Sequence, residues 1–235
     1  MAQPRVRGAT TSPSTRTTGA ARQFTDEPVG DAVLHRLLDT ARFAPNGGNR
    51  QAWHVVVVKD PAIRKGMRDL YLTPWAQYAA QGAAGLTPWP PIGDREAEAA
   101  AVASVAPVDV DAADHGLVDG LFDAPIVLAL LADLTRVVGT DRDLGRYTLV
   151  AGASIYPFAW SILVGARSEG LGGVMTTILT RQEPAMRDLL GVPDHFALAA
   201  VMMLGHPVRQ PTKLRRDPVE SFVTVDHFDG DVFGG

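Results

Sequence analysis

The chain has 235 residues and a formal net charge of −4, and 46% of its residues are hydrophobic. This length is sufficient for one sizeable core, and the weakly acidic balance gives no electrostatic basis for binding nucleic acid. The absence of cysteine excludes disulfides, thiolate metal ligands and cysteine nucleophiles. No apolar run reaches the roughly eighteen residues of a membrane span, and we expect a cytoplasmic protein.

Residues 1–21 differ in composition from the rest of the chain. Thr, Ser, Ala, Arg and Pro predominate there, and no acidic residue precedes Asp26. Such a segment buries too little apolar surface to offset the entropy lost on ordering. An arginine-rich targeting peptide is the alternative, although the segment lacks the apolar stretch that secretion requires. We predict a disordered tail over 1–21 and one domain over 22–235.

The first half of the domain begins with a helix and a strand. Apolar residues recur with helical spacing over 31–43, and the valine-rich run 53–59 predicts a strand buried on both faces. Pro61 opens a second helix, which is expected to reach about Gln81. Residues 82–122 lose periodicity and are predicted to form a long irregular insertion.

The second half of the domain is predicted to hold two strands and two helices. The strands cover 124–131 and 196–204, and the helices cover 144–168 and 183–190. The helix over 144–168 is apolar nearly all round, which indicates a place in the core or at an obligate interface. Pro157 is expected to kink it. This order of elements predicts an α+β sandwich rather than repeats or a doubly wound parallel sheet.

The loop over 44–53 reads Ala-Pro-Asn-Gly-Gly-Asn-Arg-Gln-Ala-Trp and combines bare backbone with amides. Pro45 ends the preceding helix, and Gly47 and Gly48 allow a flat ligand to approach the main chain. Three side chains offer both hydrogen-bond donors and acceptors, namely Asn46, Asn49 and Gln51. This chemistry suits a planar heterocycle such as a flavin. The alternative is an ordinary polar loop with a glycine C-cap.

The loop resembles the A-P-S-x-x-N-x-Q-P-W signature of the nitroreductase family of flavin enzymes. Further segments resemble elements of that family in the same order, at 22–29, 55–60, 169–173, 190–193, 204–207 and 215–220. The resemblance implies a three-layer sandwich with a central, mainly antiparallel sheet flanked by helices. It also implies a domain-entwined homodimer centred on the helix over 144–168, with the flavin sites at the subunit boundary.

The resemblance implies FMN as the bound cofactor and NAD(P)H as co-substrate. The matching cofactor positions are Pro45, Asn46, Gly47, Asn49 and Gln51 in the loop, Met175, Thr176 and Thr177 after the G-L-G turn, and Arg216 in the closing motif. Lys213 and Arg215 are basic alternatives to Arg216.

Three departures from the family pattern concern this cofactor. Asn46 stands where the family has serine, and Ala52 stands where it has proline. The opening motif also lacks its usual arginine and serine, because residues 18–21 read Thr-Gly-Ala-Ala. Arg22 or Arg16 is the candidate substitute for the missing phosphate contacts.

The expected activity is hydride transfer from NAD(P)H through the flavin to a nitroaromatic, quinone or activated alkene. A biosynthetic flavin dehydrogenase or oxidase and a flavin-binding protein without efficient turnover are the alternatives. The histidines are not spaced for metal ligation from one helix, so no metal is expected. Nucleophile-elbow, Walker A and dinucleotide-binding patterns are also missing.

Residues 72–120 are predicted to form a mobile lid over the substrate face of the flavin. Trp75, Tyr78 and Trp89 lie in this segment, and their rings could stack on a flat substrate. The alternative is a peripheral excursion that shields the surface.

Overall fold

A four-stranded sheet forms the centre of the protein, and neighbouring strands in it are antiparallel. The computed structural model describes residues 13–112 and 114–234. The strands in sheet order are β1 (Trp53–Val57), β2 (Ile126–Asp133), β4 (Phe196–Gly205) and β3 (Gly172–Thr176). β1 and β3 are therefore the edge strands.

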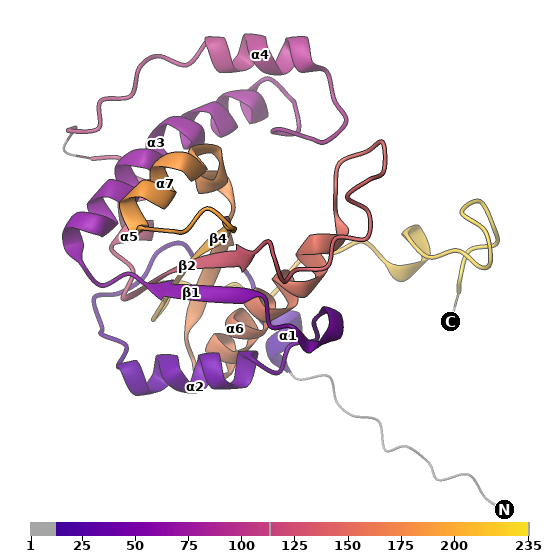
Figure 1. Ribbon diagram of the computed structural model, residues 1–235, viewed down its shortest axis with the longest axis horizontal. Coiled ribbons are helices and arrows are strands. Elements are labelled where there is room, and N and C mark those ends of the chain that lie inside the picture. Colours follow the sequence, from indigo (N-terminus) through magenta and orange to yellow (C-terminus); the bar gives the residue numbers. More distant parts are fainter. Residues whose placement is uncertain (1–12, 113, 235) are drawn as a thin grey trace, which may run out of the picture.

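Helices cover both faces of this sheet and complete three layers (Figure 1). One face carries α2 (Asp31–Ala41) and α6 (Tyr156–Ser168), with the short α1 (Pro13–Thr17) against α6. The other face carries α3 (Pro61–Ala83), α5 (Leu117–Phe122) and α7 (Glu183–Leu190), and α4 (Arg95–Ala103) packs on α3. The predicted α+β sandwich with a central antiparallel sheet is confirmed.

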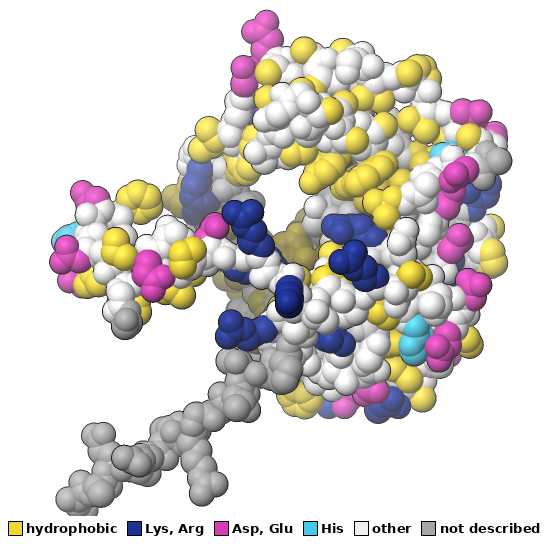
Figure 2. Space-filling model, turned by 180° about the vertical axis from the view of Figure 1, so that it is seen from behind, with side chains coloured by type: hydrophobic (Ala, Val, Ile, Leu, Met, Phe, Trp, Pro, Cys, Tyr) yellow, Lys and Arg dark blue, Asp and Glu magenta, His cyan; other side chains and the backbone are white. Residues whose placement is uncertain are grey.

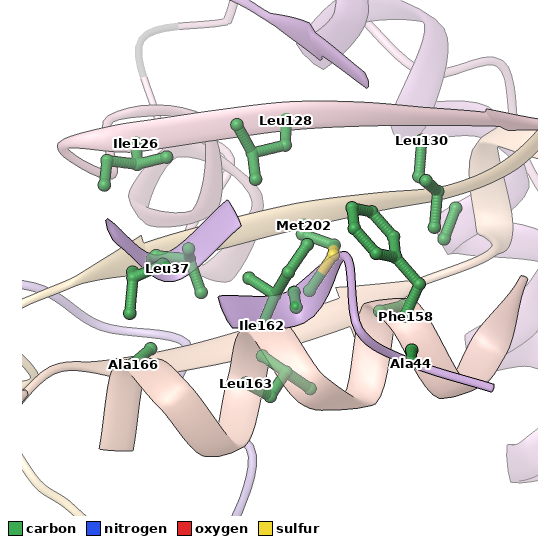
Figure 3. Packing of buried hydrophobic residues seen from close by; sticks show 14 of the residues in the cluster. Leu37, Ala44, Ile126, Leu128, Leu130, Phe158, Ile162, Leu163, Ala166 and Met202 are labelled. Carbon is green, nitrogen blue, oxygen red and sulfur yellow. The ribbon is translucent and has the colours of Figure 1, made fainter. Parts of the chain in front are cut away.

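The strand β2 supplies side chains to both cores, and each of its residues is buried. Leu128 and Leu130 join the core beneath α2 and α6, where Ile162 of α6 packs against the sheet (Figure 3). Val127 and Ala129 join the core beneath α3, α5 and α7. Successive strand residues point to opposite faces, so an unbroken apolar run serves two cores. β1, by contrast, is a half-exposed edge strand, and its predicted burial on both faces is wrong.

The helix predicted over 144–168 is wrong in its first part, because α6 begins only at Tyr156. A 3₁₀ turn over Val150–Ser154 precedes it. The loop before that turn is fixed by Asp141, whose buried carboxylate accepts the N–H of Leu149 at 2.6 Å and the N–H of Val150 at 3.2 Å. Such side-chain bonds compete with helix formation. Pro157 lies in the first turn of α6, where a helix tolerates it, so the predicted kink does not occur.

Residues 82–122 are not the irregular insertion that the sequence predicts. α3 continues to Ala83, and the segment then contains α4 and α5. Asp94 caps α4 by accepting the N–H groups of Glu96 and Ala97 at 3.0 Å, which an alanine-rich helix needs at its start. Trp75 and Tyr78 therefore lie on a continuous helix.

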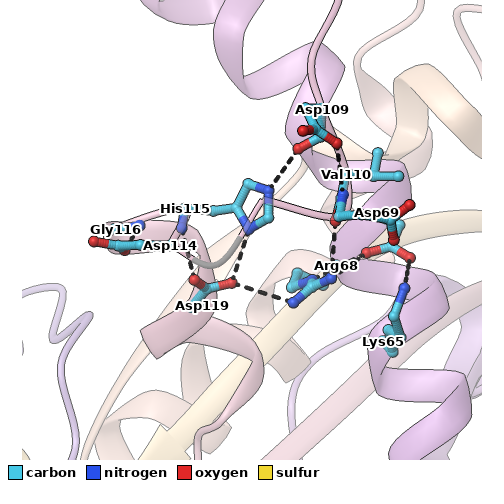
Figure 4. A network of polar contacts seen from close by, with 10 residues as sticks. Lys65, Arg68, Asp69, Asp109, Val110, Asp114, His115, Gly116 and Asp119 are labelled. Atoms are coloured by element: carbon cyan, nitrogen blue, oxygen red, sulfur yellow. Dashed lines mark hydrogen bonds and ion pairs between the residues drawn. The ribbon is translucent and has the colours of Figure 1, made fainter.

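Polar contacts attach the segment before α5 to α3 (Figure 4). Arg68 of α3 contacts Asp69 at 2.7 Å and Asp119 of α5 at 3.5 Å. The Nε2 atom of His115 lies 2.9 Å from the carbonyl oxygen of Asp109. This network places α5 and the loop before it against α3, beside the cavity described below.

The folded part begins before Arg22, where the sequence predicts its boundary. The Ser14 and Ser168 hydroxyls lie 3.0 Å apart, which joins α1 to the end of α6. The buried Ala21 donates its N–H to the carbonyl oxygen of Gly173 at 2.9 Å. The predicted tail over 1–21 is therefore wrong for residues 13–21, and residues 1–12 lie outside the described residues. In the described ranges, no helix has the length and apolar character needed to cross a membrane.

Candidate functional site

A cavity of about 410 Å³ lies where the end of β3 faces α3 and α5. We call it the β3 cavity. α3 contributes three aromatic side chains to its wall, Tyr71, Trp75 and Tyr78. β3 and the turn after it contribute Met175, Thr176 and Thr177, and Arg22 adds a positive charge. The structure thus brings four of the predicted cofactor residues together with two of the predicted substrate residues.

A second cavity of about 430 Å³ contains Arg216, and we call it the Arg216 cavity. Arg22, Val174 and Met175 line both cavities, so the two are neighbours. Figure 2 shows Lys and Arg side chains around a hollow between the body and the C-terminal arm. Two arginines at one cavity provide the planar, charged donors that bind a phosphate in bidentate fashion. Lys213 does not line either cavity and is exposed.

The residues that replace the usual arginine and serine of the opening motif also line the Arg216 cavity. Thr18, Gly19 and Ala20 lie at its wall, whereas Arg16 does not. A Cβ atom at Gly19 would lie 2.8 Å from the Cδ2 atom of Leu214, so the backbone there packs too closely for a side chain. Arg22 is therefore the only arginine of the opening segment at this cavity among the described residues.

Tyr71 is a cavity residue that the sequence analysis did not identify. Its hydroxyl lies 3.2 Å from the Thr176 hydroxyl, and the residue is 2% exposed. Burial raises the pKa of the Tyr71 hydroxyl above its usual value, so the group remains protonated at neutral pH. No local pattern distinguishes Tyr71 from the other apolar-face residues of α3, and only the pairing of α3 with the end of β3 reveals it.

The predicted substrate aromatics are only partly brought together at the cavity. The Trp75 ring is stacked beside the rings of Tyr71 and Tyr78, with centroids 6.1 and 5.7 Å away. Trp89 does not line the β3 cavity. Its ring lies 6.2 Å from that of Tyr78, and the Arg181 guanidinium lies 4.8 Å from its centroid. Trp89 therefore packs beside Tyr78, outside the β3 cavity.

The loop over 44–52 forms hydrogen bonds within itself. The Asn46 side chain accepts the N–H of Gln51 at 2.8 Å and donates to the carbonyl oxygen of Ala44 at 3.2 Å. Asn46 thus braces the loop. Gly48 and Asn49 have positive φ angles of 62° and 51°, which turn the chain sharply. The exposed side-chain amides of Asn49 and Gln51 have no intrachain hydrogen bond in the described part of the chain, so they are available to a ligand.

The predicted cofactor residues form two separate groups in one chain. Asn46, Gly47, Asn49 and Gln51 line neither the β3 cavity nor the Arg216 cavity. Pro45 lines a different groove, which runs along α6 and reaches Trp160. Within one chain, these loop residues therefore do not line either of the two cavities that could hold a flavin.

Large apolar side chains are exposed near this loop and along the C-terminal arm. Leu149, Tyr156 and Trp160 lie in or just before α6 and are 78%, 40% and 42% exposed. The arm after β4 leaves the body (Figure 1) and exposes Phe222 and Phe228. We call Leu149, Tyr156 and Trp160 the α6 surface. Tyr156 and Trp160 are one helical turn apart on α6, and exposed large apolar side chains are typical of interaction surfaces.

The structure thus combines a three-layer α+β fold with paired cavities that are lined by arginines, hydroxyls and aromatic rings. The chain matches the family described as Nitroreductase family over residues 15–206, and it belongs to that family. In the described ranges, no group of three His, Asp or Glu side chains could hold a metal ion.

Proteins that are similar to this chain have names that describe different reactions. The chain is 27% identical over 204 residues to an NADH dehydrogenase of Thermus thermophilus, covering 86% of this chain and 89% of that protein. It is 25% identical over 186 residues to a 5,6-dimethylbenzimidazole synthase of Rhodobacter capsulatus, covering 79% and 78%. An FMN and NADPH-dependent nitroreductase from Sphigopyxis sp. strain HMH shares the fold, with a TM-score of 0.61, 20% identity and coverage of 92% and 99%. Membership of this family supports the assignment of the chain to the oxidoreductases.

Proposed function

We propose that this protein is an FMN-dependent NAD(P)H oxidoreductase that acts as a homodimer. The observation that carries the proposal is the pair of neighbouring cavities that share Arg22 and Met175. FMN has a phosphate at one end and a planar ring at the other. The Arg216 cavity suits the phosphate, and the β3 cavity, with its aromatic wall and hydroxyls, suits the ring. The residues present therefore fit the cofactor.

Each group of residues has a distinct task in this proposal. Arg22 and Arg216 bind the phosphate, and the segment over 175–177 contacts the ring. Trp75 and Tyr78 form the wall against which a flat acceptor lies, and they exclude water from the reacting face. When bound, FMN supplies the hydride chemistry, so the protein needs only to bind, orient and shield. The candidate acceptors are nitroaromatics, quinones and activated alkenes.

We call the loop over 44–52 the amide loop, and in this proposal it reaches the flavin that is bound in the cavities of a second chain. Asn49 and Gln51 have free amides, yet they lie away from both cavities of their own chain. Pairing of the α6 surface with that of a second copy would bury Leu149 and Trp160 and bring one chain's loop to the other's cavities. Closed twofold pairing is the commonest form of homo-oligomer, and each dimer would then contain two composite sites.

The experiment that tests the function is reduction of the purified protein by pyridine nucleotide. We expect a yellow protein whose flavin absorbance is lost when NADPH or NADH is added without oxygen, and restored by 1,4-benzoquinone. A protein that binds FMN but stays yellow would support a dehydrogenase running in the other direction, or a flavin carrier. A protein that binds no FMN would refute the proposal.

A further inference from the structure

The hydroxyls of Tyr71 and Thr176 form a pair that has two O–H donors but uses only one of them in the contact between the two side chains. The backbone N–H of Ile178 donates to the Thr176 oxygen at 3.4 Å, and the two hydroxyls lie 3.2 Å apart. Each hydroxyl carries one proton, and one of the two protons is used between them. The described residues offer no further acceptor to this pair. One O–H group therefore has no acceptor in the described part of the chain.

The position of the pair determines where that proton can go. Both residues line the β3 cavity, and Tyr71 is buried against α5, with its ring 5.5 Å from that of Phe122. If Tyr71 donates to Thr176, the free proton belongs to Thr176. In the opposite arrangement it belongs to Tyr71. In either case the cavity is the open space next to the pair, and it contains the positive charge of Arg22.

We propose that the Tyr71–Thr176 pair donates one hydrogen bond to an oxygen atom of a ring ligand in the β3 cavity. This inference rests on the proposed function. The oxygen is a carbonyl of the flavin or an oxygen of the acceptor, such as a quinone carbonyl or a nitro group. Both gain negative charge on reduction, so a hydroxyl donor beside Arg22 stabilises the reduced state more than the oxidised one. The pair is therefore a specificity determinant for oxygen-bearing acceptors or a tuning contact of the flavin.

Three variants test the pair, namely Tyr71→Phe, Thr176→Val and the double variant. Each change removes a hydroxyl and keeps the shape of the side chain. The double variant is expected to lose about fivefold to tenfold, the usual effect of one hydrogen bond, in one of two quantities. The first is FMN affinity, measured by fluorescence titration of the apoprotein. The second is kcat/KM for 1,4-benzoquinone, with ferricyanide as an acceptor that needs no hydroxyl donor.

The two quantities distinguish the two sources of the oxygen. Loss of FMN affinity assigns the contact to a flavin carbonyl, and loss of benzoquinone turnover alone assigns it to the acceptor. One single variant should reproduce most of the double variant's effect, because only one hydroxyl holds the free proton. Tyr147→Phe is the matched control, since that hydroxyl binds Arg95 at 3.0 Å outside the cavity. Thermal unfolding is followed for each variant to compare their folded states.

A folded double variant with both quantities within about twofold of the parent would overturn the inference. The proposed function would survive that result, because the parent would still bind FMN and reduce benzoquinone. A parent protein that binds no FMN would instead refute the function, and this inference with it.

Discussion

The backbone N–H of Gly47 donates a hydrogen bond to the Ser154 hydroxyl at 3.0 Å, and this bond joins the amide loop to the turn before α6. A Cβ atom at Gly47 would lie 3.2 Å from the Cγ2 atom of Val138, so the loop also packs closely against its neighbour. The loop is therefore held by the same part of the chain that presents the α6 surface. In the proposed dimer, subunit pairing and the position of Asn49 and Gln51 would therefore depend on one another.

Replacement of Ser154 by alanine should weaken FMN binding. The variant removes one part-buried hydrogen bond of about 1 kcal/mol, so the loop becomes less ordered and FMN affinity falls by up to about fivefold. Fluorescence titration of the apoprotein measures this effect. Ser104→Ala is the control, because the Ser104 hydroxyl follows α4 and donates to the carbonyl oxygen of Ala101 within that helix. Equal FMN affinities in the two variants would show that the loop does not need this bond.

Arg216→Ala should lose FMN on gel filtration with the fold intact. A charge-assisted bond to phosphate is worth more than a neutral one, and we expect a loss of at least about tenfold in affinity. Arg216→Lys should retain part of the FMN affinity that Arg216→Ala loses, since the charge remains but the bidentate geometry does not. Arg42→Ala is the control, because that exposed arginine is paired with Asp39 at 2.7 Å. An unchanged flavin content in Arg216→Ala would refute the phosphate assignment.

Trp75→Ala should alter acceptor kinetics more than FMN affinity. The ring forms the cavity wall between Tyr71 and Tyr78, so its loss widens the space in which a flat acceptor lies. We expect a higher KM for 1,4-benzoquinone. Trp89→Ala should act more weakly, because that ring supports Tyr78 from outside the cavity. If FMN affinity fell and the benzoquinone KM stayed constant, Trp75 would be a cofactor contact and not a substrate contact.

Asp141 should make stability dependent on pH in the acid range. The N–H of Leu149 and the Arg146 guanidinium lower the pKa of Asp141 from 3.8 to about 2. The folded state therefore favours the ionised carboxylate. Its stabilising contribution is complete above the unfolded pKa and is lost as the pH falls from about 4 towards 2. Asp141→Asn should lower the melting temperature at neutral pH. The difference in melting temperature between this variant and the unmodified protein should become smaller below about pH 4. A difference in melting temperature that stays constant with pH would contradict this account.

Much of the fold follows from local patterns in the sequence. α7 has the predicted bounds, and β4 and α2 are within two residues of theirs, because continuous apolar runs and amphipathic spacing mark them. β3 was missed. It is five residues long and begins with two glycines, which have no strand preference of their own. Gly173 is needed because a Cβ atom there would lie 2.4 Å from the Cδ2 atom of Leu204 on β4. Only the distant partner strand defines β3.

The site was predicted in part for a similar reason. Motif resemblance found Arg22, Met175, Thr176 and Arg216, which the structure brings to neighbouring cavities. It could not find Tyr71, whose role depends on the packing of α3 beside the end of β3. Nor could it show that the amide loop stands apart from those cavities.

The homodimer should be tested by light scattering. The chain has a mass of 25.0 kDa, so we expect about twice that value at micromolar concentration. Leu149→Glu places a charge on the α6 surface, away from both cavities, and should yield monomers that retain little FMN. A parent protein that is monomeric while saturated with FMN would contradict the proposed dimer.

The most direct test of the central claim, that each flavin site is shared between two chains, is a mixed dimer. One chain carries Arg216→Ala and the other carries Asn49→Ala with Gln51→Ala, and two affinity tags isolate the heterodimer. A homodimer made from either variant chain alone should bind FMN poorly. If the sites are shared, the heterodimer has one site with all the defects and one intact site, so it should bind one FMN tightly. If each site belongs to a single chain, both sites carry a defect, and a heterodimer without tightly bound FMN would contradict the account.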